Sequence, residues 1–164
     1  MTDFKQSIIE TPLGDMIAIA DDHALHLLEF KTRKNLDMAL SRFTTISDGR
    51  NAILDMIASE LDDYFHGRLT SFQTPLKIYG SNFQQSVMKS LTVIPHGQTQ
   101  TYKDQSIGLN NPKAVRAVAR ANSMNQIAIV IPCHRVIGSN GKLTGYAGGL
   151  DKKQWLLNHE KKCA

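Results

Sequence analysis

The sequence has few cysteines and no long hydrophobic run. Its 164 residues include two cysteines, Cys133 and Cys163, which are too few for a disulfide framework. We therefore expect free thiols and a reducing, cytoplasmic compartment. No apolar stretch approaches the roughly 20 residues of a transmembrane helix, and residues 1–5 lack the hydrophobic region of a signal peptide. These absences argue against a disulfide-rich secreted protein and against a membrane protein.

The sequence also lacks a metal-binding pattern. Apart from His134, its histidines have no ligand-like partners at the spacing of a metal site. They are His23, His26, His66, His96 and His159. We expect no metal ion and no cofactor.

Positive charge is scarce in the first half of the chain and concentrated in the second. Residues 1–78 hold 8 Lys and Arg against 12 Asp and Glu, a balance of −4, and residues 79–164 hold 11 against 3, a balance of +8. A basic half of this size is typical of a polyanion-binding surface, and the usual polyanion is nucleic acid. On charge alone, an ordinary basic protein surface remains an alternative.

The first half is predicted to be a small α/β unit. Residues 7–9, 16–20 and 24–30 have the composition of strands, and a Pro/Gly turn follows the first, which suggests a meander. Residues 50–65 carry apolar side chains at helical spacing, and Gly67 is placed to end that helix. No group of residues in this half suggests chemistry.

The second half is predicted to begin near residues 79–82, giving domains of 1–78 and 79–164. Helical patterns start near Phe83 and again at 101–107. We expect a third, basic helix to open at Asn111 as N-cap, with Pro112 at its first position. Two short helices followed by a basic one resemble a helix-turn-helix, although any small helical bundle would give the same pattern.

A nucleophilic cysteine is predicted after this third helix. Residues 127–131 are apolar and β-branched, which predicts a buried strand or extended stretch that ends at Pro132. Cys133 comes next, followed by His134 and Arg135, and a nearby base or cation favours the reactive thiolate. From these residues alone, a core cysteine that happens to precede a histidine is an equal alternative. A turn at 138–141, a glycine-rich loop at 145–149 and a helix at 151–162 are predicted to follow.

Several motifs together resemble one protein family. Residues 131–138, IPCHRVIG, look like the acceptor-site motif of the O6-alkylguanine-DNA alkyltransferases, and residues 111–118 resemble that family's recognition helix. Tyr102, Asn125, residues 145–149 and residues 155–160 stand at the family's intervals. The resemblance is dense over 79–162 and looser in the first half. It identifies the chain as a member of this family and implies a ribonuclease-H-like first domain and a mainly helical, winged-helix-like second domain containing a helix-turn-helix.

The resemblance also implies how DNA is bound. The partner is double-stranded DNA carrying alkylated bases, and the damaged nucleotide is flipped out of the stack. Arg116 is implied to fill the space that the flipped base leaves, and Tyr102 to donate a hydrogen bond to that base. The remaining DNA-binding positions on or beside the recognition helix are Lys113, Ala117 and Arg120. Arg120 stands where the family often has a small residue, so it is expected to add a phosphate contact.

The resemblance further implies a relay from Cys133 through a water molecule and His134 to Glu160, with Asn125 holding the turn that carries the cysteine. The implied pocket is lined by Pro132, Val136, Tyr146 and Ala147. The implied reaction moves the alkyl group of O6-alkylguanine, and also of O4-alkylthymine, irreversibly to the sulfur. Nothing in the sequence releases the thioether, so each molecule is expected to react once, and to do so as a monomer.

The roles of some residues and two competing functions remain to be considered. Arg135 is equally a structural residue or a stabiliser of the thiolate, whereas Lys153 is expected to be solvated or to face phosphate. Gln126 replaces a common proline, which predicts a less rigid loop. A DNA-binding module without chemistry and a cysteine hydrolase are the competing functions, and the reactive Cys133 and the basic helix, respectively, argue against them.

Overall fold

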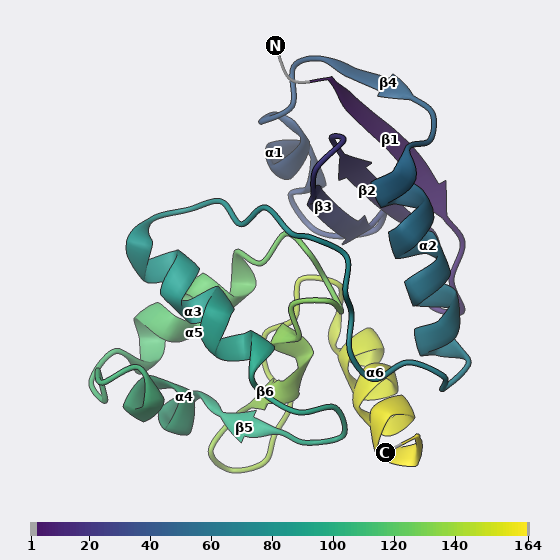
Figure 1. Ribbon diagram of the computed structural model, residues 1–164. Helices are drawn as coiled ribbons and strands as arrows, with labels where there is room; N and C mark the ends of the chain where they lie inside the picture. The colour runs from purple at the N-terminus through teal and green to yellow at the C-terminus, as the bar shows by residue number, and fades with distance from the viewer. Residues whose placement is uncertain (1–2, 164) are drawn as a thin grey trace. The chain divides into compact units, whose positions relative to one another are not determined.

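The computed structural model describes residues 3–163, which divide into two compact units, one up to Lys77 and one from Ile78. Figure 1 shows the helices and strands of both units. Across residues 3–163, no helix combines the length and apolar character needed to span a membrane.

The first unit is built on a four-stranded sheet with the order β3-β2-β1-β4. β1 (Phe4–Ile9), β2 (Met16–Ala20) and β3 (Leu25–Phe30) form the predicted antiparallel meander. The sequence did not predict β4 (Ile46–Asp48), which pairs parallel to β1. β2 and β3 are buried along their whole length: every residue of β2 is apolar, and β3 buries His26 and Glu29 together with its four apolar residues.

One long helix covers this sheet (Figure 1). α2 (Ala52–Phe65) begins where the Asn51 side chain accepts a hydrogen bond from the Leu54 N–H at 2.9 Å. Gly67, with φ of 74°, follows its end as predicted, since this left-handed conformation suits glycine. The apolar side of α2 is buried and consists of Ile53, Leu54, Ile57, Leu61 and Tyr64. A second helix, the short α1 (Leu36–Leu40), was not predicted.

The second unit begins with three helices. α3 (Asn82–Thr92) opens with a capping box formed by Ser81 and Gln84. α4 (Tyr102–Gly108) follows, and α5 (Val115–Ser123) packs against both α3 and α4. The predicted helices at residues 83–91 and 101–107 are therefore confirmed.

The predicted start of the third helix was wrong. Asn111 does not cap it with its side chain; its carbonyl instead accepts a hydrogen bond from the Ala114 N–H at 3.0 Å and closes a turn that contains Pro112. Ala114 then occupies the N-cap position, so α5 begins at Val115. The Asn-Pro pair makes the turn between the two helices, and Lys113 belongs to that turn.

A buried pair of amides fixes α5 against α4. Gln105 Nε2 donates to Asn122 Oδ1 at 3.0 Å, and Asn122 Nδ2 donates to Gln105 Oε1 at 2.8 Å. Gln105 also donates to the Ser90 hydroxyl of α3 at 3.1 Å. Because unsatisfied polar groups are costly when buried, this reciprocal pairing favours a single register between the three helices.

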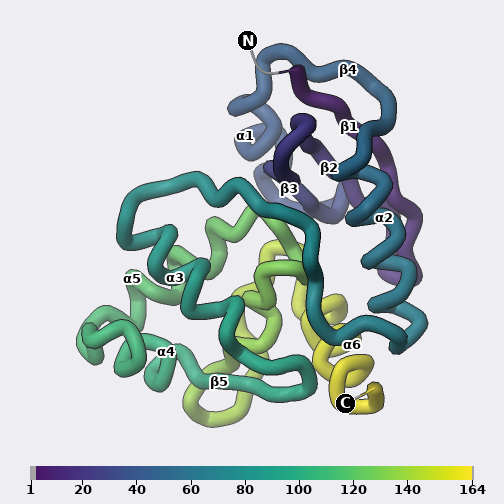
Figure 2. Tube along the Cα trace, viewed as in Figure 1, coloured from purple at the N-terminus to yellow at the C-terminus, as the bar shows by residue number. Residues whose placement is uncertain are grey.

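The prediction of a strand or extended stretch at residues 127–131 was also wrong. The segment is buried, as expected, but it is folded into turns: the Val130 N–H bonds to the Ala128 carbonyl at 2.8 Å, and the Ile131 N–H to the Ile127 carbonyl at 3.1 Å. Ile129 has φ of 72°, a conformation that a β-branched residue rarely adopts. Local hydrogen bonds thus override the strand preference of this run. Figure 2 lets the reader follow the trace from α5 through this segment.

Short elements complete the second unit. A 3₁₀ helix, η1 (Cys133–Arg135), leads into β6 (Val136–Ile137), which pairs parallel with β5 (Gln100–Thr101). The predicted turn at 138–141 is present, and the Gly141 N–H bonds to the Gly138 carbonyl at 2.9 Å. α6 (Leu150–Lys162) follows the glycine-rich loop, close to the predicted range.

Candidate active site

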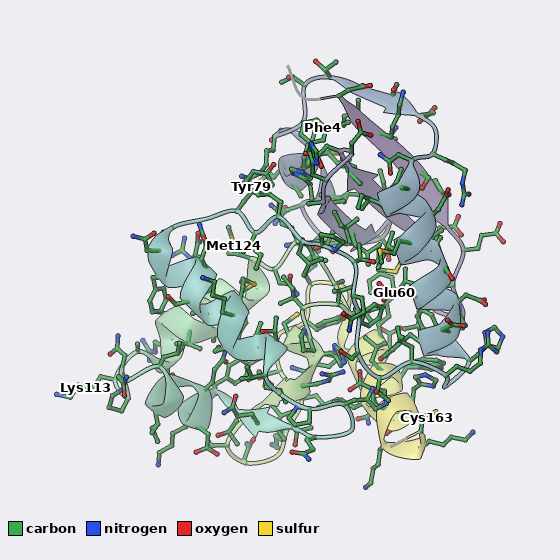
Figure 3. The ribbon with its side chains drawn as sticks, in the orientation of Figure 1. Phe4, Glu60, Tyr79, Lys113, Met124 and Cys163 are labelled. Atoms are coloured by element: carbon green, nitrogen blue, oxygen red, sulfur yellow. The ribbon has the colours of Figure 1, made fainter. Side chains whose placement is uncertain are left out.

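The candidate nucleophile stands at the start of η1. The Cys133 N–H donates to the Ile131 carbonyl at 2.9 Å across Pro132, and the cysteine is partly exposed while Pro132 is buried. The thiol is therefore held at the surface of the second unit by a turn whose backbone is fixed by proline. Cys163 lies at the C-terminal end of α6 (Figure 3), and neither cysteine forms a disulfide.

One asparagine side chain organises the segment that precedes the cysteine. Asn125 Oδ1 accepts from the Ile127 N–H at 2.9 Å, and its Nδ2 donates to the Ile131 carbonyl at 2.8 Å. The same Nδ2 lies 3.3 Å from Cys133 Sγ. A buried amide thus spans both ends of the folded turn and contacts the sulfur, which explains how the unusual conformation of Ile129 is maintained.

His134 is completely buried and is oriented by a carboxylate. Its Nε2 lies 2.7 Å from Oε2 of Glu160, which comes from α6. Since a carboxylate accepts hydrogen bonds, Nε2 carries a proton and Nδ1 is the acceptor nitrogen of the neutral ring. No protein atom among residues 3–163 hydrogen bonds to Nδ1. Burial lowers the pKa of His134, and Arg135 and Lys153 add to this effect while Glu160 opposes it, so the ring is neutral at physiological pH.

Arg135 holds the same carboxylate from the other side. Its Nε donates to Glu160 Oε1 at 2.7 Å and its Nη2 to Oε2 at 3.0 Å. Its Nη1 donates to the Ile94 carbonyl at 2.7 Å. Burial alone would raise the pKa of Glu160, but the hydrogen bonds from His134 and Arg135 outweigh it and hold that pKa well below its ordinary value. Of the two interpretations of Arg135, the structure favours the structural one.

The expectation for Lys153 was wrong. The side chain is fully buried, and its Nζ donates to the Val136 carbonyl at 2.6 Å and to the Thr144 carbonyl at 2.8 Å. It cannot face phosphate or bulk solvent. The local sequence does not distinguish a lysine on an exposed helix surface from a lysine buried beneath a loop. The two carbonyls that accept hydrogen bonds from Lys153 were therefore not predictable.

Tyr102 is positioned by one of these carbonyls. Its hydroxyl donates to the Thr144 carbonyl at 3.0 Å, and the Lys153 ammonium lies 5.8 Å from the centre of its ring. Burial raises the pKa of Tyr102, so the phenol stays protonated and can act as a donor. Of the other predicted pocket residues, Val136 is buried, and Tyr146 and Ala147 of the glycine-rich loop are half-buried.

The predicted DNA-binding residues form an exposed group at α5. Arg116, Ala117 and Arg120 are exposed on the helix, and Lys113 is exposed in the turn before it. Figure 3 shows Lys113 extending away from this turn. The spacing of four residues between Arg116 and Arg120 places these two cations along one side of the helix. Within residues 3–163, no group of His, Cys, Asp and Glu could hold a metal ion.

Comparison with known protein families finds one matching family domain in each half of the chain. Residues 4–78 match the family described as 6-O-methylguanine DNA methyltransferase, ribonuclease-like domain, and residues 82–162 match its DNA binding domain. The chain therefore belongs to the 6-O-methylguanine DNA methyltransferase family, as the sequence motifs indicated.

Individual relatives cover nearly the whole chain. A methylated-DNA–protein-cysteine methyltransferase from Methanosarcina barkeri is 44% identical over 94% of this chain and 95% of its own. One from Mycobacterium leprae is 50% identical over 93% of this chain and 90% of its own. Among solved structures, Mycobacterium tuberculosis OGT in complex with DNA is 36% identical, with a TM-score of 0.87 over 99% of this chain and 94% of that one.

The buried ion pair makes a prediction about stability. Arg135→Met removes the cation from Glu160 and should lower the free energy of unfolding by about 3–5 kcal/mol, as breaking a buried pair does. Because the pKa of Glu160 is lowered in the folded state, the pair stabilises at neutral pH and this stabilisation is lost in acid. The variant should therefore lose less stability than the parent as the pH falls below about 4.5.

Urea unfolding followed by the fluorescence of Trp155, the one tryptophan, measures both effects in the second unit. Arg120→Met is the matched control, since it removes an exposed arginine and should change the free energy of unfolding by less than about 0.5 kcal/mol. Equal losses in the two variants would contradict a stabilising role for the buried pair.

Proposed function

We propose that this protein repairs DNA by transferring the alkyl group of O6-alkylguanine to Sγ of Cys133, irreversibly and once per molecule. The observation that carries the proposal is the neighbouring pair of a partly exposed Cys133 and a buried, neutral His134 held by Glu160. The methyltransferase names of the relatives support the same reaction. O4-alkylthymine is a further expected substrate.

The residues around the cysteine suit a proton relay. His134 Nδ1 is a buried acceptor next in sequence to the thiol, so a water molecule between them would pass the thiol proton to the imidazole. Glu160 then stabilises the imidazolium, as the acidic member of a catalytic triad does. Asn125 contributes by holding the turn and by donating to the sulfur, which favours the thiolate.

The transfer step balances without a cofactor. The thiolate forms a bond to the alkyl carbon, the bond between that carbon and guanine O6 breaks, and the electron pair goes to the guanine. A proton from the Tyr102 hydroxyl, restored from the relay, would neutralise the departing base. Thioethers are poor leaving groups, and no second nucleophile is assigned to release the alkyl group. Val136, Tyr146, Ala147 and Pro132 would line the pocket.

The exposed cations of α5 support duplex binding. We assign α4 and α5 to a helix-turn-helix within a winged-helix-like domain spanning residues 79–164, with residues 1–78 as a separate α/β domain. Arg116 would enter the stack when the damaged base flips out, because a planar guanidinium stacks on bases and hydrogen bonds to them. Lys113 and Arg120 would contact phosphates, and Ala117 would allow close approach to the groove. We also propose that the protein acts as a monomer and that it is cytoplasmic.

The stoichiometry of transfer tests the assignment of Cys133. With methylated duplex in excess, the protein should take up one methyl group per molecule and stop. Cys133→Ala should take up none while still binding DNA, and Cys163→Ala, the matched control at the other thiol, should behave like the parent. Continuing release of methyl groups would indicate a hydrolase, and binding without uptake a lesion-binding module. Peptide mapping that located the methyl group at Cys163 would contradict the proposal.

Comparing two substrates tests the role of Arg116. Arg116→Ala should slow transfer from alkylated duplex much more than transfer from free O6-benzylguanine, because the free base needs no flipping. Arg120→Ala, a control on the same helix, should weaken duplex binding and lower its salt dependence, since phosphate contacts release counterions. Single-turnover rates at saturating duplex separate these effects. Equal losses on both substrates would mean that Arg116 supports the fold or the pocket.

The pH profile of transfer tests the relay. Between about pH 6 and 9, Glu160→Gln should lower the single-turnover rate and move its profile to higher pH, because the thiol, with a reference pKa near 8.5, loses its supported base. His134→Gln should do so more severely, and the double variant should be little worse than His134→Gln alone. Circular dichroism checks the fold of each variant. If the losses multiply, or Glu160→Gln does not fold, Glu160 is a structural carboxylate and the relay is wrong.

A further inference from the structure

Uncharged polar side chains are buried where α4 packs against α5 (Figure 1). Gln105 and Asn122, which are 1% and 4% exposed, exchange two hydrogen bonds of 3.0 and 2.8 Å. Gln105 also donates to the Ser90 hydroxyl of α3 at 3.1 Å. The two side chains that α4 buries, those of Gln105 and Ser106, are both polar, whereas its apolar Ile107 is exposed. The contact of α4 with α5 therefore relies on hydrogen bonds of defined geometry.

The start of α4 is fixed to the candidate active site. β5, which directly precedes α4, pairs with β6, the strand that follows the turn of Cys133. The first residue of α4, Tyr102, donates from its hydroxyl to the Thr144 carbonyl at 3.0 Å. Gln105 lies three residues further along the same helix. Its pairing with Asn122 therefore fixes α5 relative to the part of the unit that carries the nucleophile.

α5 has a buried side and an exposed side. Val118, Ala121 and Asn122 are buried, whereas Arg116 and Arg120 are exposed. A rotation of α5, or a shift of α5 along α4, would break the paired amides and would also move the two arginines. Valine and alanine tolerate such a change of register more readily than a reciprocal pair of buried hydrogen bonds does, because apolar contacts have no fixed direction.

We propose that Gln105 and Asn122 are positioning residues, whose paired amides set the register of α5 and thereby place the Arg116 side chain for entry into the duplex. Both residues act through Arg116, and the inference rests on the role in base flipping that the proposed function gives to this arginine. Apolar side chains of similar shape can often replace a buried polar pair without loss of stability. The pair therefore contributes a defined register to this contact, beyond any contribution to stability.

Replacing both amides tests register separately from stability. In Gln105→Leu/Asn122→Leu no amide of the pair is left unsatisfied, so the variant should fold and should unfold in urea close to the parent's midpoint. Its register is no longer specified. The single-turnover rate at saturating alkylated duplex should therefore fall by a factor of about 10 to 100, because a misplacement of about 1 Å can cost about 10²-fold.

The rate with free O6-benzylguanine should be unchanged in the same variant, because the free base needs no flipping by Arg116. The Asn122 carbonyl, which accepts from the Asn125 N–H at 3.2 Å, is retained, so the turn that holds Cys133 keeps its backbone contact with α5. A fall of both rates by the same factor, or a ratio of the two rates equal to the parent's, would overturn the proposal.

Ser106→Ala is the matched control for the loss of a buried polar group. Ser106 is fully buried on the same helix, but its hydroxyl donates to the Tyr102 carbonyl within α4 at 2.9 Å. This substitution removes no hydrogen bond between helices, so the ratio of the duplex rate to the free-base rate should remain that of the parent. A change of ratio as large as that of the double variant would show that any buried polar loss in α4 has this effect, and the proposal would be wrong.

Combination with Arg116→Ala tests whether the pair acts through this arginine. In the Arg116→Ala background, Gln105→Leu/Asn122→Leu should cause little further loss on duplex, because the side chain that the pair places is already absent. Residues that act as a unit lose their effects non-additively. Losses that multiply would show that the amide pair acts on another step and would overturn the proposal.

A single substitution keeps the proposal falsifiable if the double variant does not fold. Gln105→Met retains an unbranched side chain of similar length but breaks the pairing, and circular dichroism identifies the temperature at which it is folded. An unchanged ratio of the two rates in Gln105→Met would overturn the proposal. If the parent accepts no alkyl group from either substrate, the proposed function is wrong. If the parent reacts with both and the variants keep its ratio, only the positioning role is wrong.

Discussion

One buried carboxylate holds the second unit and its candidate active site together. Glu160 accepts a hydrogen bond from His134 and two from Arg135, and Arg135 reaches on to the Ile94 carbonyl just beyond α3. The carboxylate therefore connects the last helix, the 3₁₀ turn of the cysteine and the end of the first helix of the unit. Its removal would leave an uncompensated, buried guanidinium, so the stability of the unit and, in the proposed relay, the reactivity of Cys133 depend on the same two oxygens.

Whether an element of the fold could be predicted from the sequence depends on whether local or distant residues stabilise it. The apolar runs of β2 and β3 and the helical spacing of apolar residues in α2 predicted these elements, because the buried residues of each follow directly from its own sequence. β4 has three residues, and only its pairing with β1 makes it a strand. Residues 127–131 have the composition of a strand, but the Asn125 side chain bonds to both ends of the segment and folds it back on itself. Such contacts leave no periodic signal.

The residues of the candidate site were likewise only partly predictable from the sequence. Cys133 and His134 are adjacent, so their chemistry was visible in the sequence, whereas Glu160 was assigned through the family resemblance alone. The burial of Lys153 was missed because its two acceptors are backbone carbonyls, which every residue possesses and which therefore carry no sequence signal. The sequence analysis expected this charged side chain at the surface, whereas the tertiary structure buries it against the Val136 and Thr144 carbonyls.

The distance along the chain between His134 and Glu160 has a consequence for synthesis. The two residues are 26 positions apart, and the carboxylate that completes the site lies near the end of α6. Since chains grow from the N-terminus and domains fold as units, a ribosome-bound chain that has not yet reached Glu160 carries the cysteine but not its oriented base. In the proposed relay, the thiol therefore gains its oriented base only when the last helix docks. The order of synthesis, as well as the geometry, ties the proposed activation of this cysteine to the folded protein.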